Sequence, residues 1–234
     1  MHIAMWSGPR NLSTAMMYSF GARADFDVVD EPFYGAYLAL TGSDHPMRVE
    51  TMASMECDPA RVAQSMALRH DRHVYSKQMT HHMVPGIDRS WFPAARHVFL
   101  IRHPARVVAS YAAKREKPVL EDLGFVQQAE IFEEVCALGQ SPVVMDTHDI
   151  RRDSEKTLQQ LCDALGLAWD SAMLRWPAGG HSADGVWAEH WYGAVHRSTC
   201  FSGAEGDLPL LEPDMIKIAE AGLPSYEALY ALKI

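Results

Sequence analysis

The sequence predicts a single α/β domain of three layers, in which helices cover both faces of a central parallel sheet. Short β-prone runs alternate with helical patterns along most of the chain, and this alternation is typical of βαβ units. The length of 234 residues and the hydrophobic content of 48% suffice for one such domain with a sizeable core. Within 1–234 we expect a cofactor-binding core over 1–150 and a cover of C-terminal helices and loops over 151–234.

Five short apolar runs are the expected strands. Each is bounded by residues that favour turns or helix starts. The runs are HIAMW at 2–6, FDVVD at 26–30, VYSKQM at 74–79, HVFLI at 97–101 and VVMD at 143–146.

Three of the expected helices show an apolar stripe at helical spacing. The first begins after Asp58, a typical N-cap, with Pro59 at the first helical position. The second lies within 121–139 and the third within 153–166, and each ends at a glycine. Their apolar positions are Val62 and Met66, then Ile131, Val135 and Leu138, then Leu158, Leu161 and Leu165.

The last part of the chain divides into an irregular stretch and a final helix. Residues 167–210 are rich in Trp, Gly and Pro and show little periodicity. A helical pattern returns near 213–232. We therefore expect loops that cover the sheet, followed by one helix at the end.

The composition excludes several classes of protein. A net charge of −9 argues against a general nucleic-acid binder, so an anionic ligand must meet a local basic pocket. The four cysteines are far apart and no acidic cluster stands out, so we expect reduced thiols and no metal. Neither a signal-peptide pattern nor an apolar run of about 18 residues is present, so we expect a cytoplasmic protein without a membrane partner. An exposed sheet edge would allow a homodimer.

The first loop, SGPRNLST at 7–14, joins the first strand to a helix. Ligands often bind there, because the start of a helix exposes N–H groups with partial positive charge. Gly8 allows a close turn, Arg10 brings a full charge, and Ser13 and Thr14 bring hydroxyls, a set that suits phosphate or sulfate. In the alternative interpretation a hydroxyl only caps the helix and Arg10 is a solvated surface charge. The lysine and second glycine of the GxxxxGK[ST] nucleotide loop are absent.

A second basic stretch follows the fourth expected strand. The strand ends at Arg102, Pro104 begins a helix, and Arg106 and Ser110 lie one turn apart on one helix face. Arg102 and Ser110 could therefore converge beside the rim of the sheet. The structural alternative makes Ser110 a serine bonded to its own helix and places Arg102 in an ion pair. Two strand ends would then carry arginine and hydroxyls by coincidence.

Together, the pattern Gly-x-Arg-x-x-Ser-Thr after the first strand and Arg-x7-Ser after a later strand resembles the two cofactor motifs of sulfotransferases. These enzymes use 3′-phosphoadenosine 5′-phosphosulfate (PAPS), and the wider chain resembles a bacterial branch of sulfotransferase-like proteins. The resemblance implies a P-loop-NTPase-like sulfotransferase fold and PAPS as co-substrate, without metal. The family's first loop often reads Pro-Arg-Ser-Gly-Thr-Thr, whereas this chain has PRNLST at 9–14. By resemblance, the sulfuryl end is held by Arg10, Asn11, Leu12, Ser13 and Thr14, and the 3′-phosphate by Arg102 and Ser110.

Sulfuryl transfer needs a base for the acceptor's proton. Glu31 follows the second expected strand, and several sulfotransferases use a glutamate in this region. His81 follows the third, in a stretch similar to the one from which cytosolic members draw their base. We favour Glu31 because Pro32 and the strand end would fix its direction, although an ion pair with Arg10 would weaken it as a base. Lys77 is expected to point its ammonium at the leaving oxygen or sulfate.

Aromatic residues gather in two regions that could form the acceptor pocket. Phe33, Tyr34 and Tyr37 come directly after the candidate base and are expected to line the pocket. For any single aromatic residue, a place in the core is the simpler interpretation. The residues that could close over the pocket are Trp187, His190, Trp191 and Tyr192.

These observations lead us to expect an enzyme that transfers a sulfuryl group from PAPS to a small hydroxyl- or amine-bearing acceptor. The transfer would be in line, with a Glu or His general base. One alternative is a P-loop-type nucleotide-dependent phosphotransferase, in which Asp146 could be a magnesium ligand although the loop lysine is missing. Another is a non-catalytic module that binds a nucleotide or anion.

Overall fold

Five parallel strands form one central sheet in the order β2-β3-β1-β4-β5. The structure is a computed structural model that describes residues 1–68, 71–113 and 118–234. All five expected runs form strands, with bounds that differ by at most one residue. The strands are β1 His2–Ser7, β2 Phe26–Asp30, β3 His73–Met79, β4 Arg96–Ile101 and β5 Val143–Asp146.

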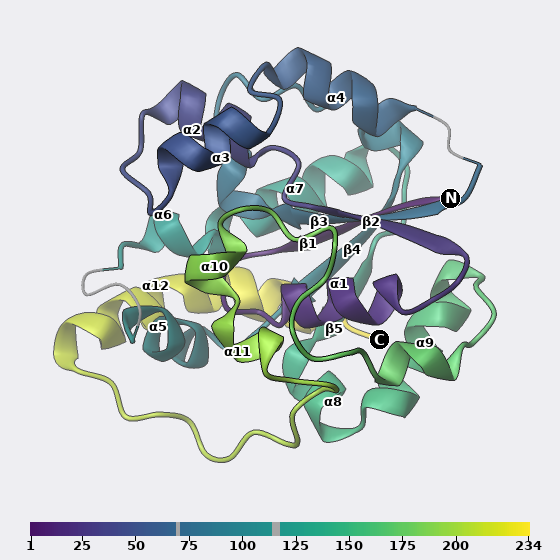
Figure 1. Ribbon diagram of the computed structural model, residues 1–234. Coiled ribbons are helices and arrows are strands. Elements are labelled where there is room, and N and C mark those ends of the chain that lie inside the picture. Colours follow the sequence, from purple (N-terminus) through teal and green to yellow (C-terminus); the bar gives the residue numbers. More distant parts are fainter. Residues whose placement is uncertain (69–70, 114–117) are drawn as a thin grey trace.

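Helices cover both faces of this sheet, with α1, α8 and α9 on one side and α4 and α7 on the other (Figure 1). Side chains of β1 alternate between the two layers, because Ile3 and Met5 enter one core cluster whereas Ala4 and Trp6 enter the other. The expected three-layer architecture is therefore confirmed. The helices named here are α1 Ser13–Gly21, α4 Pro59–Ala67, α7 Phe125–Ala137, α8 Thr147–Arg152 and α9 Ser154–Leu165.

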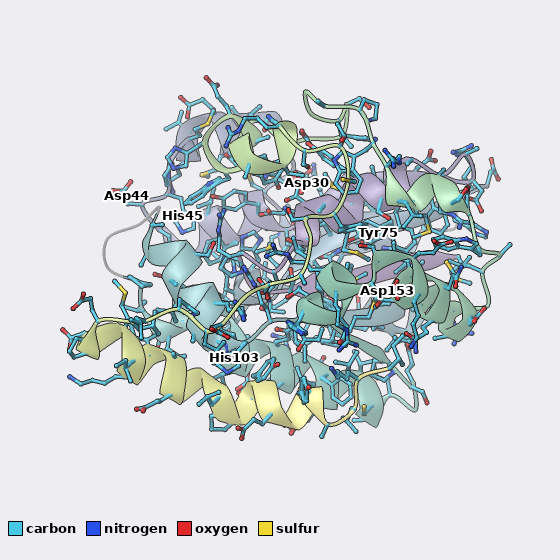
Figure 2. All side chains as sticks on the ribbon, turned by 90° about the horizontal axis from the view of Figure 1, so that it is seen from below. Asp30, Asp44, His45, Tyr75, His103 and Asp153 are labelled. Atoms are coloured by element: carbon cyan, nitrogen blue, oxygen red, sulfur yellow. The ribbon has the colours of Figure 1, made fainter. Side chains whose placement is uncertain are left out.

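Shorter and peripheral elements complete the fold. Helices α5 and α12 pack together beside β4 and β5, where the ring of His103, labelled in Figure 2, lies 5.4 Å from the ring of Tyr226 between centroids. Among the described residues, no helix is long and apolar enough to cross a membrane. The remaining elements are α2 Tyr34–Thr41, α3 Arg48–Ser54, η1 Thr80–His82, η2 Phe92–Ala94, α5 Pro104–Ala112, α6 Leu120–Leu123, η3 Ser171–Leu174, α10 Ala188–Trp191, α11 Gly193–His196 and α12 Pro213–Tyr230.

The expected capping residues are confirmed at two helices. The Asp58 side chain accepts hydrogen bonds from the backbone N–H groups of Ala60 and Arg61 at the start of α4, and Pro59 is the first helical residue. Helix α9 ends at Gly166, which has a φ of 68° as a left-handed C-cap requires.

The helix expected within 121–139 is α7, but the stretch is not helical throughout. Gly124, with a φ of 69°, divides this stretch into α6 and α7. The Thr80 hydroxyl donates to the Gly124 carbonyl oxygen at 3.0 Å, and a Cβ at Gly124 would lie 2.3 Å from the Thr80 Oγ1 atom. The break thus lets the chain approach η1 closely. Leu138 follows the end of α7 and is 48% exposed, so it does not extend the buried stripe.

The segment between η3 and α12 crosses the carboxyl end of the sheet, where α10 and α11 lie in front of the strands in Figure 1. It is anchored there by a hydrogen bond from the Gly185 N–H to the Asp30 carboxylate at 3.3 Å, and by contacts of Tyr192 with Lys77 on β3. At the end of the chain, Lys233 forms a parallel bridge with Val144 of β5. The irregular stretch predicted from the sequence therefore covers the sheet edge at which ligands of such folds bind.

Candidate functional site

The carboxyl edge of the sheet contains a cavity of about 260 Å³. The chain reverses its direction across the sheet at β1, which has β3 on one side and β4 on the other. Ligands of open α/β sheets bind outside the strand ends at such a point. Residues that follow β1, β2, β3 and β4 all line the cavity, together with α10 and α11. The sequence motifs therefore meet at one place.

The loop after β1 leaves the start of α1 open. Leu12 is the N-cap residue, and no side chain forms a capping hydrogen bond, so the interpretation that Ser13 or Thr14 only caps the helix is wrong. Arg10 and Leu12 have φ angles of 65° and 59°, a left-handed conformation that costs a residue other than glycine about 1–3 kcal/mol. These residues all line the cavity, namely Arg10, Leu12, Ser13 and Thr14. The N–H groups of the first helical turn are therefore available to a ligand there.

Two residues of this loop fasten it to the rest of the protein. A Cβ at Gly8 would lie 2.1 Å from the Leu123 carbonyl oxygen, so Gly8 permits close packing against α6. The Asn11 side chain is 1% exposed and donates its amide N–H to the Leu100 carbonyl oxygen on β4 at 3.4 Å. Asn11 lines the cavity as predicted, but its amide nitrogen is used to bind the loop to β4.

Arg10, Arg102 and Ser110 are in direct contact although they come from distant parts of the sequence. The Arg10 Nε atom donates to the Ser110 Oγ atom at 2.9 Å, and the Arg102 Nη1 atom donates to the Arg10 carbonyl oxygen at 2.7 Å. Burial and the neighbouring Arg102 charge both lower the pKa of Arg10. Within the described part of the chain, no acidic side chain pairs with Arg10. An anionic ligand would supply the missing negative charge.

Arg102 does form an ion pair, as the structural alternative expects. Its Nε atom lies 3.1 Å from the Glu205 Oε1 atom, and its Nη2 atom also donates to that oxygen. Arg106 Nε lies 3.2 Å from Glu205 Oε2, and Arg151 Nη1 lies 2.8 Å from Oε1. Burial alone would raise the pKa of Glu205, but the hydrogen bond and charge of Arg102, with the charges of Arg106 and Arg151, lower it.

Arg151 and Glu205 were not found by sequence reasoning. Arg151 lies on α8, beyond the last strand, and Glu205 lies in an irregular segment, so neither belongs to a recognisable motif. The only available signal was the pair of arginines at 151 and 152 shortly after the end of β5.

The other end of the cavity holds a buried cluster around Lys77. The Lys77 Nζ atom donates to Glu31 Oε1 at 2.7 Å, to Asp30 Oδ1 at 3.1 Å and to the Tyr192 hydroxyl. All three ammonium N–H groups are thus engaged, and the Lys77 side chain is 2% exposed. In this arrangement Lys77 holds two carboxylates instead of pointing at a leaving oxygen. The pairing of Glu31 with Arg10, considered from the sequence, does not occur.

One ammonium is shared by two carboxylates in this cluster. Burial raises the pKa of Asp30 to about 6, although the Lys77 charge acts in the opposite direction. Burial alone would lower the pKa of Lys77, but the Asp30 and Glu31 charges outweigh it and raise that pKa. Burial and the same two carboxylates raise the pKa of Tyr192, which therefore remains a phenol. The Tyr192 oxygen accepts from the Trp187 indole N–H at 3.0 Å and donates to Asp30 at 2.9 Å.

Glu31 is held in a strained conformation at the end of β2. Its φ of 44° is left-handed, which is uncommon for a residue with a side chain and concentrates at functional sites. The Glu31 N–H donates to the Lys77 carbonyl oxygen at 3.0 Å, which fixes the turn. Lys77 occupies Oε1 of the carboxylate, while Oε2 lies 3.9 Å from the Nε2 atom of His82. Glu31 lines the cavity, as its prediction as the base requires.

His81 and His82 both reach the cavity from η1. His82 is 1% exposed and stacks on the rings of Tyr34 and Tyr37, with ring centroids 4.7 and 4.8 Å away. Burial and the nearby His81 lower the pKa of His82 well below its ordinary value, so its imidazole is neutral. Sequence reasoning selected His81, but it is His82 that contacts Glu31.

Of the three aromatics expected to line the acceptor pocket, only Tyr34 does so. Its hydroxyl forms a hydrogen bond with His45 Nδ1 at 2.9 Å. Tyr37 stacks on His82 without lining the cavity, and Phe33 is buried in the core against Trp91, with ring centroids 5.8 Å apart. The expectation is wrong for these two residues because α2 begins here and turns them toward the interior.

The later aromatics also divide into two groups. Trp191 and Tyr192 line the cavity as expected. Trp187 is buried and supports the Tyr192 hydroxyl, whereas His190 is exposed to solvent. Two of the four residues expected to close over the pocket therefore line the cavity, and Val195 of α11 does so as well.

Asp146 is not placed as a magnesium ligand of this cavity. Its carboxylate accepts from the His148 N–H at 2.7 Å and caps α8, and it accepts from the Tyr226 hydroxyl at 2.7 Å. It does not contribute to the cavity wall. Over the described ranges, no group of three or more His, Cys, Asp or Glu side chains is placed to hold a metal ion.

Comparison with known families identifies the family of this chain. Residues 1–233 match the family model described as "Sulfotransferase domain". The chain belongs to the sulfotransferase domain family. The chain is also 37% identical, over 232 residues, to "Branched-chain-amino-acid aminotransferase-like protein 1" of Arabidopsis thaliana. The match covers 97% of this chain and 41% of that relative, so the chain spans less than half the length of the relative.

Solved structures support the same fold. A sulfotransferase from Alicyclobacillus acidocaldarius is 11% identical with a TM-score of 0.57, and the match covers 99% of this chain and 96% of that one. A mouse sulfotransferase complexed with PAP is 10% identical with a TM-score of 0.50, covering 99% and 87% of the two chains. The predicted fold and the predicted family are therefore confirmed.

Proposed function

We propose that this sulfotransferase transfers a sulfuryl group from PAPS to a small hydroxyl- or amine-bearing acceptor. The observation that carries the proposal is the contact between the two arginine motifs at one end of the cavity. Arg10, which no acidic side chain of the described residues neutralises, lies beside Arg102 and the open start of α1. This end of the cavity favours a ligand with several negative charges. The complex of the mouse sulfotransferase with PAP supports a nucleotide of this kind.

The donor would lie with its two charged ends on two different loops. Arg10, Ser13, Thr14 and the N–H groups of α1 would hold the sulfuryl end. Arg102 would hold the 3′-phosphate together with Ser110, whose hydroxyl now accepts from Arg10. Backbone N–H groups at a helix start and arginine side chains are the usual partners of phosphate and sulfate.

At the other end, Glu31 would remove the acceptor's proton. Lys77 holds one oxygen of the carboxylate and leaves Oε2 toward neutral His82, so the base has a fixed direction. A positioned base contributes about 10²–10⁴-fold to a rate. Positioning of acceptor and donor in line would contribute much of the remainder, as in phosphoryl transfer. His81, which also reaches the cavity, is the second candidate for the base.

Calorimetry with adenosine 3′,5′-bisphosphate and adenosine 5′-phosphate tests the donor assignment. Charge-assisted hydrogen bonds are worth about 1.5–3 kcal/mol each, so the second phosphate should improve affinity at least about tenfold. Arg102→Ala should remove this preference. Arg96→Ala, at the opposite and exposed end of β4, should retain it. Equal affinities of the unaltered protein for the two nucleotides would contradict the proposal.

A further inference from the structure

The segment 202–211, between α11 and α12, is held on the protein mainly by arginines. It has no regular secondary structure, and within the described residues it makes no backbone–backbone hydrogen bond. Arg106 donates to the carbonyl oxygens of Gly206 and Asp207, and Arg151 donates to that of Gly203 at 2.9 Å. Its neighbours are exposed, but the Glu205 side chain is only 2% exposed. Glu205 is thus a buried attachment point in a mostly exposed segment.

Positive charge exceeds negative charge at this attachment. The guanidinium groups of Arg102, Arg106 and Arg151 share the single carboxylate of Glu205. The space around them forms a second cavity of about 410 Å³, which shares Arg102 and Ser110 with the main cavity. A carboxylate brings one charge and two acceptor oxygens, whereas a phosphate monoester brings a charge of about −1.5 to −2 and three strong acceptor oxygens. The site is therefore better matched to a phosphate than to the carboxylate it holds.

We propose that Glu205 is an internal competitor for the phosphate site of this sulfotransferase. Its carboxylate occupies the Nε and Nη2 atoms of Arg102, which the second phosphate of the nucleotide needs. Binding of that phosphate displaces Glu205 from Arg102 and so loosens segment 202–211, and loss of the nucleotide restores the contact. Glu205 thereby weakens the binding of nucleotides that carry the second phosphate and leaves the others unaffected. This inference rests on the proposed donor.

The substitution Glu205→Gln removes the competing charge and keeps the shape of the side chain. It should tighten the binding of adenosine 3′,5′-bisphosphate at least about tenfold in calorimetry, while the affinity for adenosine 5′-phosphate changes less than about twofold. Asp207→Asn is the matched control, because Asp207 lies on the same segment and contacts Arg106 only through its backbone carbonyl. Unchanged or weaker binding in Glu205→Gln would overturn the inference and show that the carboxylate organises the arginines. Equal tightening in both variants would also overturn the inference, because it would show only a general effect of charge on nucleotide binding.

Proteolysis of the unaltered protein gives an independent measurement. A protease specific for glutamate should cleave after Glu205 faster when adenosine 3′,5′-bisphosphate is bound, and adenosine 5′-phosphate should leave the rate unchanged. Protection by the bisphosphate would mean that the segment closes over the nucleotide, and would overturn the inference. If the unaltered protein shows no preference for the bisphosphate, the proposed donor fails; if it shows the preference and Glu205 has no influence, only the inference fails.

Discussion

The two ends of the cavity differ in how their positively charged side chains are paired. The end proposed to bind the donor, here called the donor end, contains Arg10 and Arg102. Arg10 has no acidic partner in the described part of the chain, and Arg102 shares the Glu205 carboxylate with two further arginines. The end proposed to bind the acceptor, here called the acceptor end, contains Lys77. Its ammonium is fully engaged by Asp30, Glu31 and the Tyr192 hydroxyl. A cation without an acidic partner indicates a place that a ligand completes, whereas a cation whose N–H groups are all engaged fixes a geometry before any ligand arrives.

The largest expected effect concerns the acceptor end. Glu31→Gln should lower the rate of sulfuryl transfer by about 10²–10⁴-fold, because the amide cannot accept the proton, while nucleotide affinity changes little. The measurement is single-turnover transfer from PAPS to a panel of small alcohols and amines, with calorimetry alongside. Asp27→Asn, an exposed carboxylate on the same strand, is the control and should leave both unchanged.

Two outcomes would change the interpretation of the acceptor end. Full activity in Glu31→Gln would move the base to a histidine of η1, and His81→Ala would then test it. If the unaltered protein binds the bisphosphate tightly but transfers to no acceptor, the module that only binds nucleotide becomes the better description.

The next prediction compares the two cations directly. Lys77→Met leaves Asp30 and Glu31 buried without a counter-charge, so it should lower the free energy of unfolding by about 3–5 kcal/mol. Arg10→Met removes a charge that repels Arg102, which offsets the lost hydrogen bond to Ser110, so stability should change by less than about 1 kcal/mol. Urea unfolding of both variants gives these values. Similar losses in the two variants would show that the charges at the two ends are equally compensated.

The sequence allowed the sheet and the donor end to be predicted because both depend on local patterns. Strand runs, an N-cap at Asp58 and the positions of Arg10 and Arg102 after strand ends can be recognised within about ten residues. The topology then brings the strand ends together, since parallel strands place their carboxyl ends at one edge.

The acceptor end could be predicted only in part because it depends on contacts between distant segments. Lys77 and Glu31 were found from their strand positions, but Tyr192 joins them from a segment without periodicity, more than a hundred residues away. Phe33 and Tyr37 were misplaced because proximity to Glu31 in the sequence does not fix which way a helix start turns. Glu205 had no local signal, because its ion-pair partners Arg102, Arg106 and Arg151 are all distant in the sequence.

A smaller effect is expected in the pH dependence of stability. His82 has a folded pKa well below its unfolded value near 6.5, so its contribution to stability is complete above pH 6.5 and is lost as the pH falls. Asp30, with its pKa raised to about 6, acts oppositely and contributes stability that is lost as the pH rises through about 6. His82→Phe should therefore reduce the loss of stability between pH 6.5 and 5 by up to about 1.4 kcal/mol per pH unit.

Urea unfolding at several pH values measures this difference. His97 and His103 also have lowered pKa values because they are buried, but both remain in the variant and cancel in the comparison. The same slope in the variant and the unaltered protein would show that His82 takes up its proton in the folded state.

The smallest expected effect concerns the strain stored at the donor end. Leu12 stands where the resembling family often has glycine, and its φ of 59° costs a residue with a side chain about 1–2 kcal/mol. Leu12→Gly relieves this cost but increases the entropy of the unfolded chain and removes partial packing against the core, so stability should change by less than about 1 kcal/mol. Leu12→Ala retains the strain and loses the packing, and should destabilise the protein by about 1–2 kcal/mol. Equal losses in both variants on urea unfolding would show that the left-handed conformation of Leu12 carries no strain.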